Sequence, residues 1–193
     1  MTKKNQTTYA LLGLITAGYR TGYEMKQMID QSLHHFWKIS YGQIYPALNQ
    51  LTEAGWVTAA PAAQERKPDR KEYQITAEGK KTLQNWLEEP IKEIATEKNE
   101  FLLKLFFCKQ QKRSVTAVKV KEYQRKLQER YETYQAIEQS IMSCSDHSTD
   151  AEYWLFTLDF GKRSTLAGIE WCEATIRRLT SGKDEADGKN DHH

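Results

Sequence analysis

The sequence has little of what several common architectures need. Only three of its 193 residues are cysteines, Cys108, Cys144 and Cys172, and none forms a C-x-x-C pair, so neither a disulfide framework nor a zinc ribbon is expected. Four prolines and ten glycines are too few for a fibrous repeat or for extended disorder. No apolar run approaches the roughly 18 residues of a membrane span, and the N-terminal run is too short for a secretory signal. These absences favour a folded protein of the cytoplasm.

Catalytic and metal-binding patterns are also missing. The chain has no G-x-S-x-G and no H-E-x-x-H sequence, and the GKKT stretch at residues 79–82 lacks the upstream glycine of a phosphate-binding loop. His34 and His35 are adjacent, and adjacent residues cannot share one helix face, which argues against a metal pair. An enzyme is therefore the weaker interpretation, and no catalytic residue, metal or cofactor is expected.

Charge is nearly balanced along the chain. The net charge is +2 overall, with +3 on residues 1–88 and −1 on residues 89–193. Because this bias is weak, an argument for nucleic-acid binding must depend on where the cations lie. Four of them gather in or beside one polar segment with two prolines, PAAQERKPDR at residues 61–70: Arg66, Lys67, Arg70 and Lys71.

Two helices are predicted at the start of the chain. The apolar run from Tyr9 to Ile15 predicts a short buried helix, with Thr7 or Thr8 as its N-cap. A second amphipathic helix is predicted over residues 22–34, because apolar residues recur there at roughly helical spacing. These residues are Tyr23, Met25, Met28, Ile29 and Leu33.

The third predicted helix, over residues 40–54, has the strongest local signal. Ser40 is followed three residues later by Gln43, which is the spacing of a capping box, and Gly55 is placed to end the helix in a left-handed conformation. One stripe is apolar and must face the core: Ile44, Ala47, Leu48 and Leu51. The opposite side carries Gly42, Tyr45, Pro46, Asn49, Gln50 and Glu53.

Two short strands and a fourth helix follow. Residues 56–60 and 72–76 have strand character, and the polar segment between them is too long for a two-residue hairpin, so it is predicted to be a loop between paired strands. Thr76 is placed to cap a helix over residues 77–89, which ends before Pro90.

The second half is predicted to be helical, with no strand signal. A short helix is marked by Phe101, Leu102, Leu105 and Phe106; Ser114 and Asp150 are placed to cap two longer helices. Along these two helices apolar residues recur largely in steps of three and four, which is typical of a packed helix pair. The recurring residues are Val120, Tyr123, Leu127, Tyr131, Tyr134, Ile137 and Ile141, then Leu155, Leu158, Leu166, Ile169, Ile176 and Leu179.

Together these patterns predict a mostly α protein. Helix, helix, capped helix, strand, cationic loop, strand and helix within about 80 residues is the order of a winged helix-turn-helix domain. The predicted organisation is a winged helix-turn-helix DNA-binding domain over residues 1–88, an α-helical dimerisation domain over residues 89–180, and a disordered tail over residues 181–193 that lacks apolar side chains.

The sequence over residues 9–88 resembles the PadR family of bacterial transcription regulators. Three spacings carry most of the resemblance: G-x-I-Y-P-A-L at residues 42–48, L-x-x-x-G at residues 51–55, and Y-x-I-T-x-x-G at residues 73–79. The helical second half, with an aromatic run at residues 153–160, is similar to the larger PadR subgroup that is related to virulence activators. The resemblance implies a homodimer, usually a repressor, that a small molecule can release from DNA.

The predicted DNA interface centres on the third helix. Helix-turn-helix proteins read bases from the first turns of this helix, so the candidates are Tyr41, Gly42, Gln43, Tyr45, Asn49 and Gln50. Gln43 or Asn49 could pair with an adenine edge through two hydrogen bonds, but Gln43 cannot do so well if its amide is used in the cap. Contacts to phosphates or the minor groove are expected from Lys3, Lys4, Arg20, Tyr23, Lys38, Arg66, Lys67, Arg70 and Lys71.

Dimerisation is assigned to the apolar seams of the second half. The residues are Tyr123, Leu127, Tyr131, Tyr134, Leu155, Leu158, Leu166, Ile169, Ile176 and Leu179. Trp154, Phe156 and Trp171 are candidates for lining a pocket for a small aromatic or hydrophobic effector. A protein-interaction module without DNA affinity stays open as an alternative, and the sequence does not separate a repressor from an activator.

Overall fold

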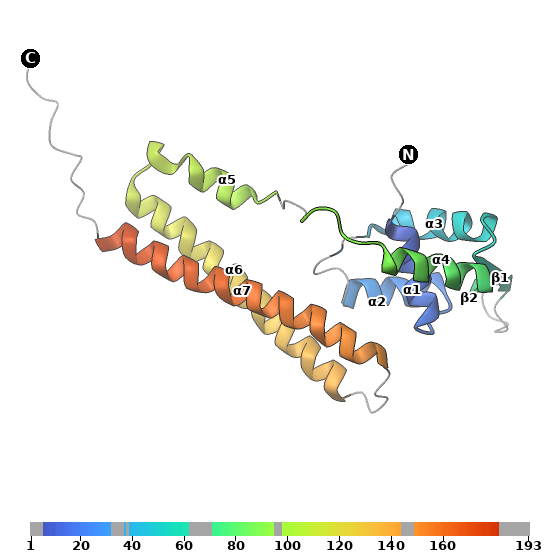
Figure 1. The fold of residues 1–193 in the computed structure, drawn as a ribbon. Coiled ribbons are helices and arrows are strands. Elements are labelled where there is room, and N and C mark those ends of the chain that lie inside the picture. The colour runs from blue at the N-terminus through green and yellow to red at the C-terminus, as the bar shows by residue number, and fades with distance from the viewer. Residues whose placement is uncertain are drawn as a thin grey trace, which may run out of the picture. The chain divides into compact units, whose positions relative to one another are not determined.

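The computed structural model describes residues 6–31, 37, 39–61, 71–94, 98–143 and 149–181 (Figure 1). The chain divides into two compact units, Met1–Ile94 and Ala95–His193. Each unit has its own apolar core, so each is a separate piece of folded structure. None of the described helices is both long enough and apolar enough to span a bilayer.

The first unit has the element order of a winged helix. Its elements are α1 (Gln6–Thr16), α2 (Gly22–Gln31), α3 (Tyr41–Glu53), β1 (Val57–Pro61), β2 (Lys71–Ile75) and α4 (Ala77–Glu88). The two strands pair antiparallel, with Val57 opposite Ile75 and Pro61 opposite Lys71. Thr21, in the connection before α2, forms an isolated bridge with Glu72 and so joins this connection to the wing.

The core of the first unit surrounds α1. Side chains from α1, α2, α3 and β1 are fully buried there: Leu11, Leu12, Met25, Ile29, Ile44, Leu48, Leu51 and Val57. Tyr9 stacks on Trp86 of α4 with ring centroids 4.8 Å apart. The predicted apolar stripe of α3 is confirmed as the face that packs into this core, which leaves its opposite face at the surface.

Gly55 ends α3 as predicted. Its φ is +72°, in the left-handed region that favours glycine. The Gly55 N–H donates to the Thr52 carbonyl at 3.1 Å, and the Trp56 N–H donates to the Leu51 carbonyl at 3.0 Å, which is the Schellman pattern. This C-terminal cap turns the chain sharply from α3 into β1.

Helix starts were predicted less well than helix ends. Thr7 and Thr8 lie inside the first turn of α1, where both are buried, so the prediction that one of them is the N-cap is wrong. The start of α2 has a capping box that the sequence analysis missed: the Glu24 N–H donates to the Thr21 hydroxyl at 3.2 Å, and the Thr21 N–H donates to the Glu24 carboxylate at 3.0 Å. Leu33, predicted to continue α2, lies outside the described residues.

The second unit is a long helix pair with a short helix beside it. Its elements are α5 (Glu100–Phe106), a 3-10 turn η2 (Cys108–Gln110), α6 (Arg113–Ser143) and α7 (Thr149–Ser181). Helices α6 and α7 run side by side in opposite directions (Figure 1), and Arg113 at the start of α6 donates to the Arg178 carbonyl near the end of α7 at 2.5 Å. Because the helices begin at Arg113 and Thr149, Ser114 and Asp150 lie in their first turns and are not the predicted caps.

Small residues on α7 let the two long helices approach closely. A Cβ added to Gly161 would lie 3.1 Å from the Tyr134 ring, and one added to Gly168 would lie 3.0 Å from Leu127. Cys172 on α7 and Val120 on α6 are fully buried in the same seam. A recurrence of large apolar residues does not reveal these small ones, so this part of the seam was not predicted.

Candidate nucleic-acid interface

The exposed side of α3 is the first part of the candidate interface. Tyr41 and Tyr45 are 56% and 43% exposed, and the other predicted reading residues of this helix are exposed too: Gly42, Gln43, Asn49 and Gln50. The helix is anchored by its buried stripe, so this polar flank is held in a fixed orientation toward solvent. Such a flank can be presented to base edges in a major groove.

Gln43 is engaged in the N-terminal cap of α3. Its Oε1 atom accepts hydrogen bonds from the Ser40 backbone N–H at 2.9 Å and from the Ser40 hydroxyl at 3.0 Å. Pairing with adenine needs both the oxygen and the nitrogen of an amide, and here the oxygen is occupied. Asn49, exposed two turns further along, is therefore the better candidate for adenine readout.

The start of α2 lies against the tyrosines of α3. A Cβ added to Gly22 would lie 2.9 Å from Cε1 of Tyr45, so the Tyr45 ring occupies the space beside this glycine. Tyr45 meets Tyr41 edge-on, with centroids 5.9 Å apart and an interplanar angle of 75°. The Lys26 ammonium lies over the Tyr41 ring, 4.8 Å from its centroid.

Tyr23 is also exposed on α2, at 56%. Gln27, one turn later, donates from its side-chain amide to the Tyr23 hydroxyl at 3.1 Å. Tyr23 was predicted for the interface from the sequence, whereas Gly22, Lys26 and Gln27, which lie beside the exposed tyrosines, were not. The Thr21-to-Glu24 capping box was the available signal, since it fixes the start of α2 and places Tyr23, Lys26 and Gln27 at neighbouring surface positions.

The predicted cations are only partly within the described residues. The Arg20 side chain is exposed, and its backbone is held by Glu24 and by Tyr73, whose N–H donates to the Arg20 carbonyl at 2.8 Å. Lys71 is exposed at the start of β2. The others lie outside the described residues: Lys3, Lys4, Lys38, Arg66, Lys67 and Arg70.

The residues predicted for dimerisation lie mostly between helices of one chain. Leu127, Tyr134 and Leu158 are buried, and Leu166 is 38% exposed. The remaining six are half-buried: Tyr123, Tyr131, Leu155, Ile169, Ile176 and Leu179. Leu127 and its half-buried neighbours Tyr123 and Ile169 belong to the core that α6 and α7 share within the chain.

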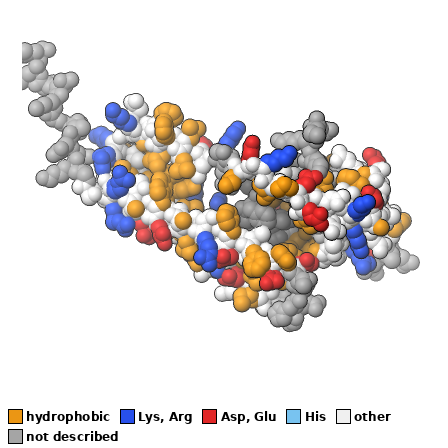
Figure 2. Space-filling view, in the orientation of Figure 1, with side chains coloured by type: hydrophobic (Ala, Val, Ile, Leu, Met, Phe, Trp, Pro, Cys, Tyr) orange, Lys and Arg blue, Asp and Glu red, His pale blue; other side chains and the backbone are white. Residues whose placement is uncertain are grey.

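Other apolar side chains of the second unit face solvent. Figure 2 shows hydrophobic side chains gathered over the end of this unit that carries α5. The exposed ones on α5, the following turn and α6 are Leu102, Leu103, Phe106, Phe107, Val115, Val118 and Met142, and those on α7 include Tyr153, Phe156 and Phe160. Exposed apolar surface of this extent is typical of a protein-interaction face.

The three candidate effector residues do not form one cluster within a chain. Trp171 meets Phe101 of α5 edge-on at 6.3 Å, and Phe101 stacks on Tyr123 at 4.0 Å. Phe156 pairs with Tyr153, with ring centroids 5.9 Å apart. This pair lies about 22 Å from Trp171, toward the start of α7. Trp154 is half-buried near Phe156. Within the residues the structure describes, no group of three or more His, Cys, Asp or Glu side chains could hold a metal ion.

Two family models match the chain. The Transcriptional regulator PadR-like family matches residues 11–85, and the Virulence activator alpha C-term family matches residues 97–180. The Negative transcriptional regulator PadR of Bacillus subtilis is 33% identical over 177 residues, which are 89% of this chain and 96% of that protein. The chain belongs to the PadR family.

Solved structures place this PadR-family chain in the same fold. Bacillus subtilis PadR in complex with operator DNA superimposes with a TM-score of 0.79 and 27% identity, covering 89% of this chain and 98% of that one. The same protein in complex with p-coumaric acid gives a TM-score of 0.77 and 25% identity, covering 93% and 99%. The predicted fold class is confirmed, and the PadR-family relatives are DNA-binding transcriptional regulators, not enzymes.

Proposed function

We propose that this PadR-family chain binds a pseudo-palindromic operator as a homodimer and represses transcription. One α3 helix enters the major groove of each half-site. The observation that carries the proposal is the polar flank of α3, where Tyr41, Tyr45 and Asn49 are exposed opposite a fully buried stripe. Operator DNA lies in the cytoplasm of a bacterium, and the relatives are bacterial proteins, so the chain acts there.

Cations of the first unit supply the contacts that do not depend on the DNA sequence. Lys71 opens β2, and Arg20 lies beside the wing. The sequence between the two strands adds Arg66, Lys67 and Arg70. Each phosphate contact adds about 0.9 to the slope of log affinity against log salt concentration. Binding is therefore expected to weaken steeply with added salt.

The second unit supplies the dimer contact. A single reading helix contacts too few base pairs for useful specificity, whereas a two-fold dimer presents two. The exposed apolar residues of α5, the following turn and α7, among them Phe106, Phe107 and Phe160, are supported as the self-association face by their exposure of 81%, 63% and 74%. The seam residues Leu127, Tyr134 and Leu158 stabilise this face indirectly by holding α6 against α7.

A small aromatic molecule is proposed to release the dimer from DNA. A relative described as a negative regulator binds p-coumaric acid in a crystal structure, which supports both the sign of regulation and the chemical class of effector. Trp154 and Phe156 at one end of α7, and Trp171 farther along it, are candidate contacts for such a ring. Loss of operator binding on addition of p-coumaric acid is the expected behaviour.

Selection from a random duplex pool tests the proposed function. The wild-type chain is expected to enrich a two-fold symmetric sequence, and the triple variant Tyr41→Ala, Tyr45→Ala, Asn49→Ala is expected to enrich none while remaining a dimer in sedimentation. The matched control replaces Gln84 and Asn85, exposed on α4, by alanine and is expected to select the wild-type sequence. Stable wild-type dimers with no DNA selectivity would instead support the protein-interaction alternative.

A further inference from the structure

Gly22 is a glycine that the backbone itself does not require. It opens α2, and the described glycines with a positive φ are Gly18 and Gly55, so Gly22 is not among them. Alanine is also the better helix former at a helical position. A Cβ added at Gly22 would meet the Tyr45 ring, 2.9 Å from Cε1 and 3.2 Å from the hydroxyl oxygen.

The seated ring is the first member of a chain of contacts across the reading surface. Tyr45 holds Tyr41 edge-on at 5.9 Å, and the Tyr41 ring lies 4.8 Å from the Lys26 ammonium, within the range of a cation–π contact. Among the described residues, no carboxylate forms an ion pair with Lys26. Its positive charge is thus located by the Tyr41 ring, which in turn contacts the Tyr45 ring.

We propose that Gly22 positions this surface for DNA: its missing side chain seats Tyr45, and Tyr45 and Tyr41 together present the Lys26 ammonium to a DNA phosphate beside the reading helix. This inference rests on the proposed DNA-binding function. Both tyrosines are about half exposed, so the cluster lies at the surface and its geometry is not needed to complete the apolar core. A cation that is already oriented loses less side-chain entropy on binding than a free one.

A double-mutant cycle tests the positioning role of Gly22. The probe is the duplex that the wild-type chain enriches from the random pool. Gly22→Ala is expected to bind this duplex about tenfold more weakly. This factor corresponds to the middle of the range of interaction free energies measured between residues in contact. If Gly22→Ala weakens binding by displacing the Tyr45 ring, then adding Gly22→Ala to a Tyr45→Ala variant should lower the DNA affinity by less than about twofold further. The control Gly13→Ala places a Cβ where nothing lies within 4 Å and should bind as wild type.

The phosphate role of Lys26 has its own readout. Lys26→Met keeps the apolar stem and is expected to lower the slope of log affinity against log salt concentration by about 0.9. In the free protein, the ε-methylene resonance of Lys26 should show a ring-current shift that Tyr41→Leu abolishes, which tests the contact without DNA and without altering Gly22. An unchanged salt slope or an unshifted resonance would overturn the assignment of Lys26.

The outcomes separate this inference from the function on which it rests. A wild-type chain that selects no duplex contradicts the proposed function itself. A wild-type chain that selects one, with a folded Gly22→Ala variant that binds as tightly as Gly13→Ala, overturns only the positioning role. If thermal unfolding shows that Gly22→Ala is not folded, the DNA-binding salt slopes of Tyr45→Leu and Tyr41→Leu test the proposal instead, since neither substitution lies in α2. Salt slopes equal to that of wild type in both variants would contradict the positioning role.

Discussion

At the level of single residues, a group of close backbone contacts joins the start of α4 to the end of α3. The Trp56 carbonyl accepts from the Thr76 N–H at 3.0 Å, and the Thr76 hydroxyl donates to the Gly55 carbonyl at 2.8 Å while accepting from the Gly79 N–H at 3.0 Å. A Cβ at Gly79 would lie only 2.1 Å from the Trp56 carbonyl oxygen. The Y-x-I-T-x-x-G spacing thus has a steric and a hydrogen-bonding cause.

Gly79→Ala is therefore expected to destabilise the first unit. The atom in the way belongs to the backbone, so α4 must move, and overpacking of this kind costs about 1–3 kcal/mol of unfolding free energy. Denaturant unfolding followed by tryptophan fluorescence measures the loss, because Trp86 and Trp56 both pack near Tyr9. The control Gly13→Ala is expected to unfold at the wild-type midpoint or above it; equal midpoints for both variants would contradict this account of Gly79.

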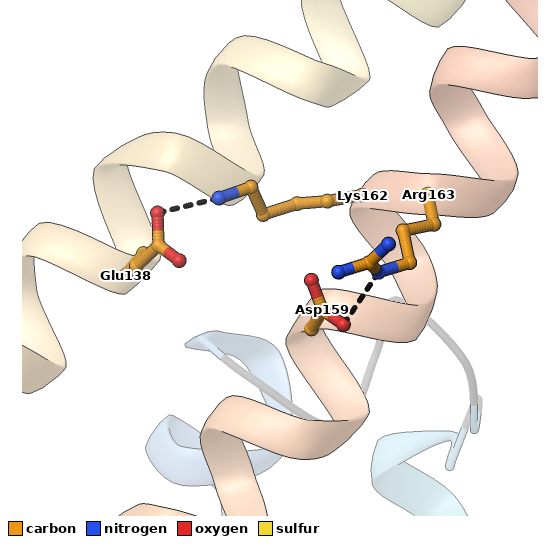
Figure 3. Close-up of polar contacts among 4 residues, drawn as sticks. All are labelled: Glu138, Asp159, Lys162 and Arg163. Atoms are coloured by element: carbon orange, nitrogen blue, oxygen red, sulfur yellow. Dashed lines mark hydrogen bonds and ion pairs between the residues drawn. The ribbon is translucent and has the colours of Figure 1, made fainter.

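At the scale of elements, a polar link joins the two long helices. Lys162 of α7 donates to the Glu138 carboxylate of α6 at 2.6 Å, and their side chains are 18% and 33% exposed (Figure 3). Arg163, the next residue, pairs with Asp159 of its own helix at 2.7 Å and is 78% exposed (Figure 3). The first pair can fix how α6 and α7 align, whereas the second has no role between helices.

Lys162→Met is expected to lower the stability of the second unit by about 1–2 kcal/mol, since it leaves a partly buried carboxylate without its cation. Arg163→Gln, the matched control, should leave the unfolding free energy close to that of wild type, because this exposed pair is screened by solvent. Urea unfolding followed by circular dichroism measures both effects. Equal losses in the two variants would show that the pair between helices has no special weight.

The same pair predicts a pH dependence of unfolding. Its hydrogen bond and charge hold the pKa of Lys162 above its ordinary value of 10.5. The contribution of the pair is therefore fully present below pH 10.5 and is lost as the pH rises through the higher folded value. The stability difference between wild type and Lys162→Met should shrink over this alkaline range.

At the scale of the whole molecule, the family match and the two-unit division support one division of labour. The first unit presents α3, and the second presents apolar surface that a single chain leaves exposed. Because the two units are covalently joined, self-association of the second in the proposed homodimer would place two copies of the first on one DNA molecule and raise their effective concentration for a pair of half-sites. Under the proposed function, operator affinity should accordingly depend on the second unit as well as on α3.

Local sequence signals predicted much of the fold and which face of α3 is exposed. Ser40 with Gln43, Gly55 and Thr76 each act on neighbours within a few residues, so α3, its ends and α4 followed from spacing alone. The seat of Tyr45 on Gly22 joins positions on different helices, and no pattern within one helix encodes it.

The errors have equally specific causes. Thr7, Ser114 and Asp150 are good N-cap residues, but each helix begins one residue before them, so their preference for the cap position did not fix where the helix starts. Gly161, Gly168 and Cys172 lie where α7 packs against α6. The predicted seam was based on large apolar side chains and did not include them.

Dimethyl sulfate protection of the selected duplex tests whether α3 is the reading helix, because this reagent methylates guanine N7 in the major groove. With wild-type chain bound, the account predicts two groups of protected guanines, related by the two-fold axis and centred about one helical turn or a multiple of it apart. The triple variant at Tyr41, Tyr45 and Asn49 should protect neither group. Protection confined to the minor groove, or unchanged protection by the triple variant, would contradict the assignment of α3 as the reading helix.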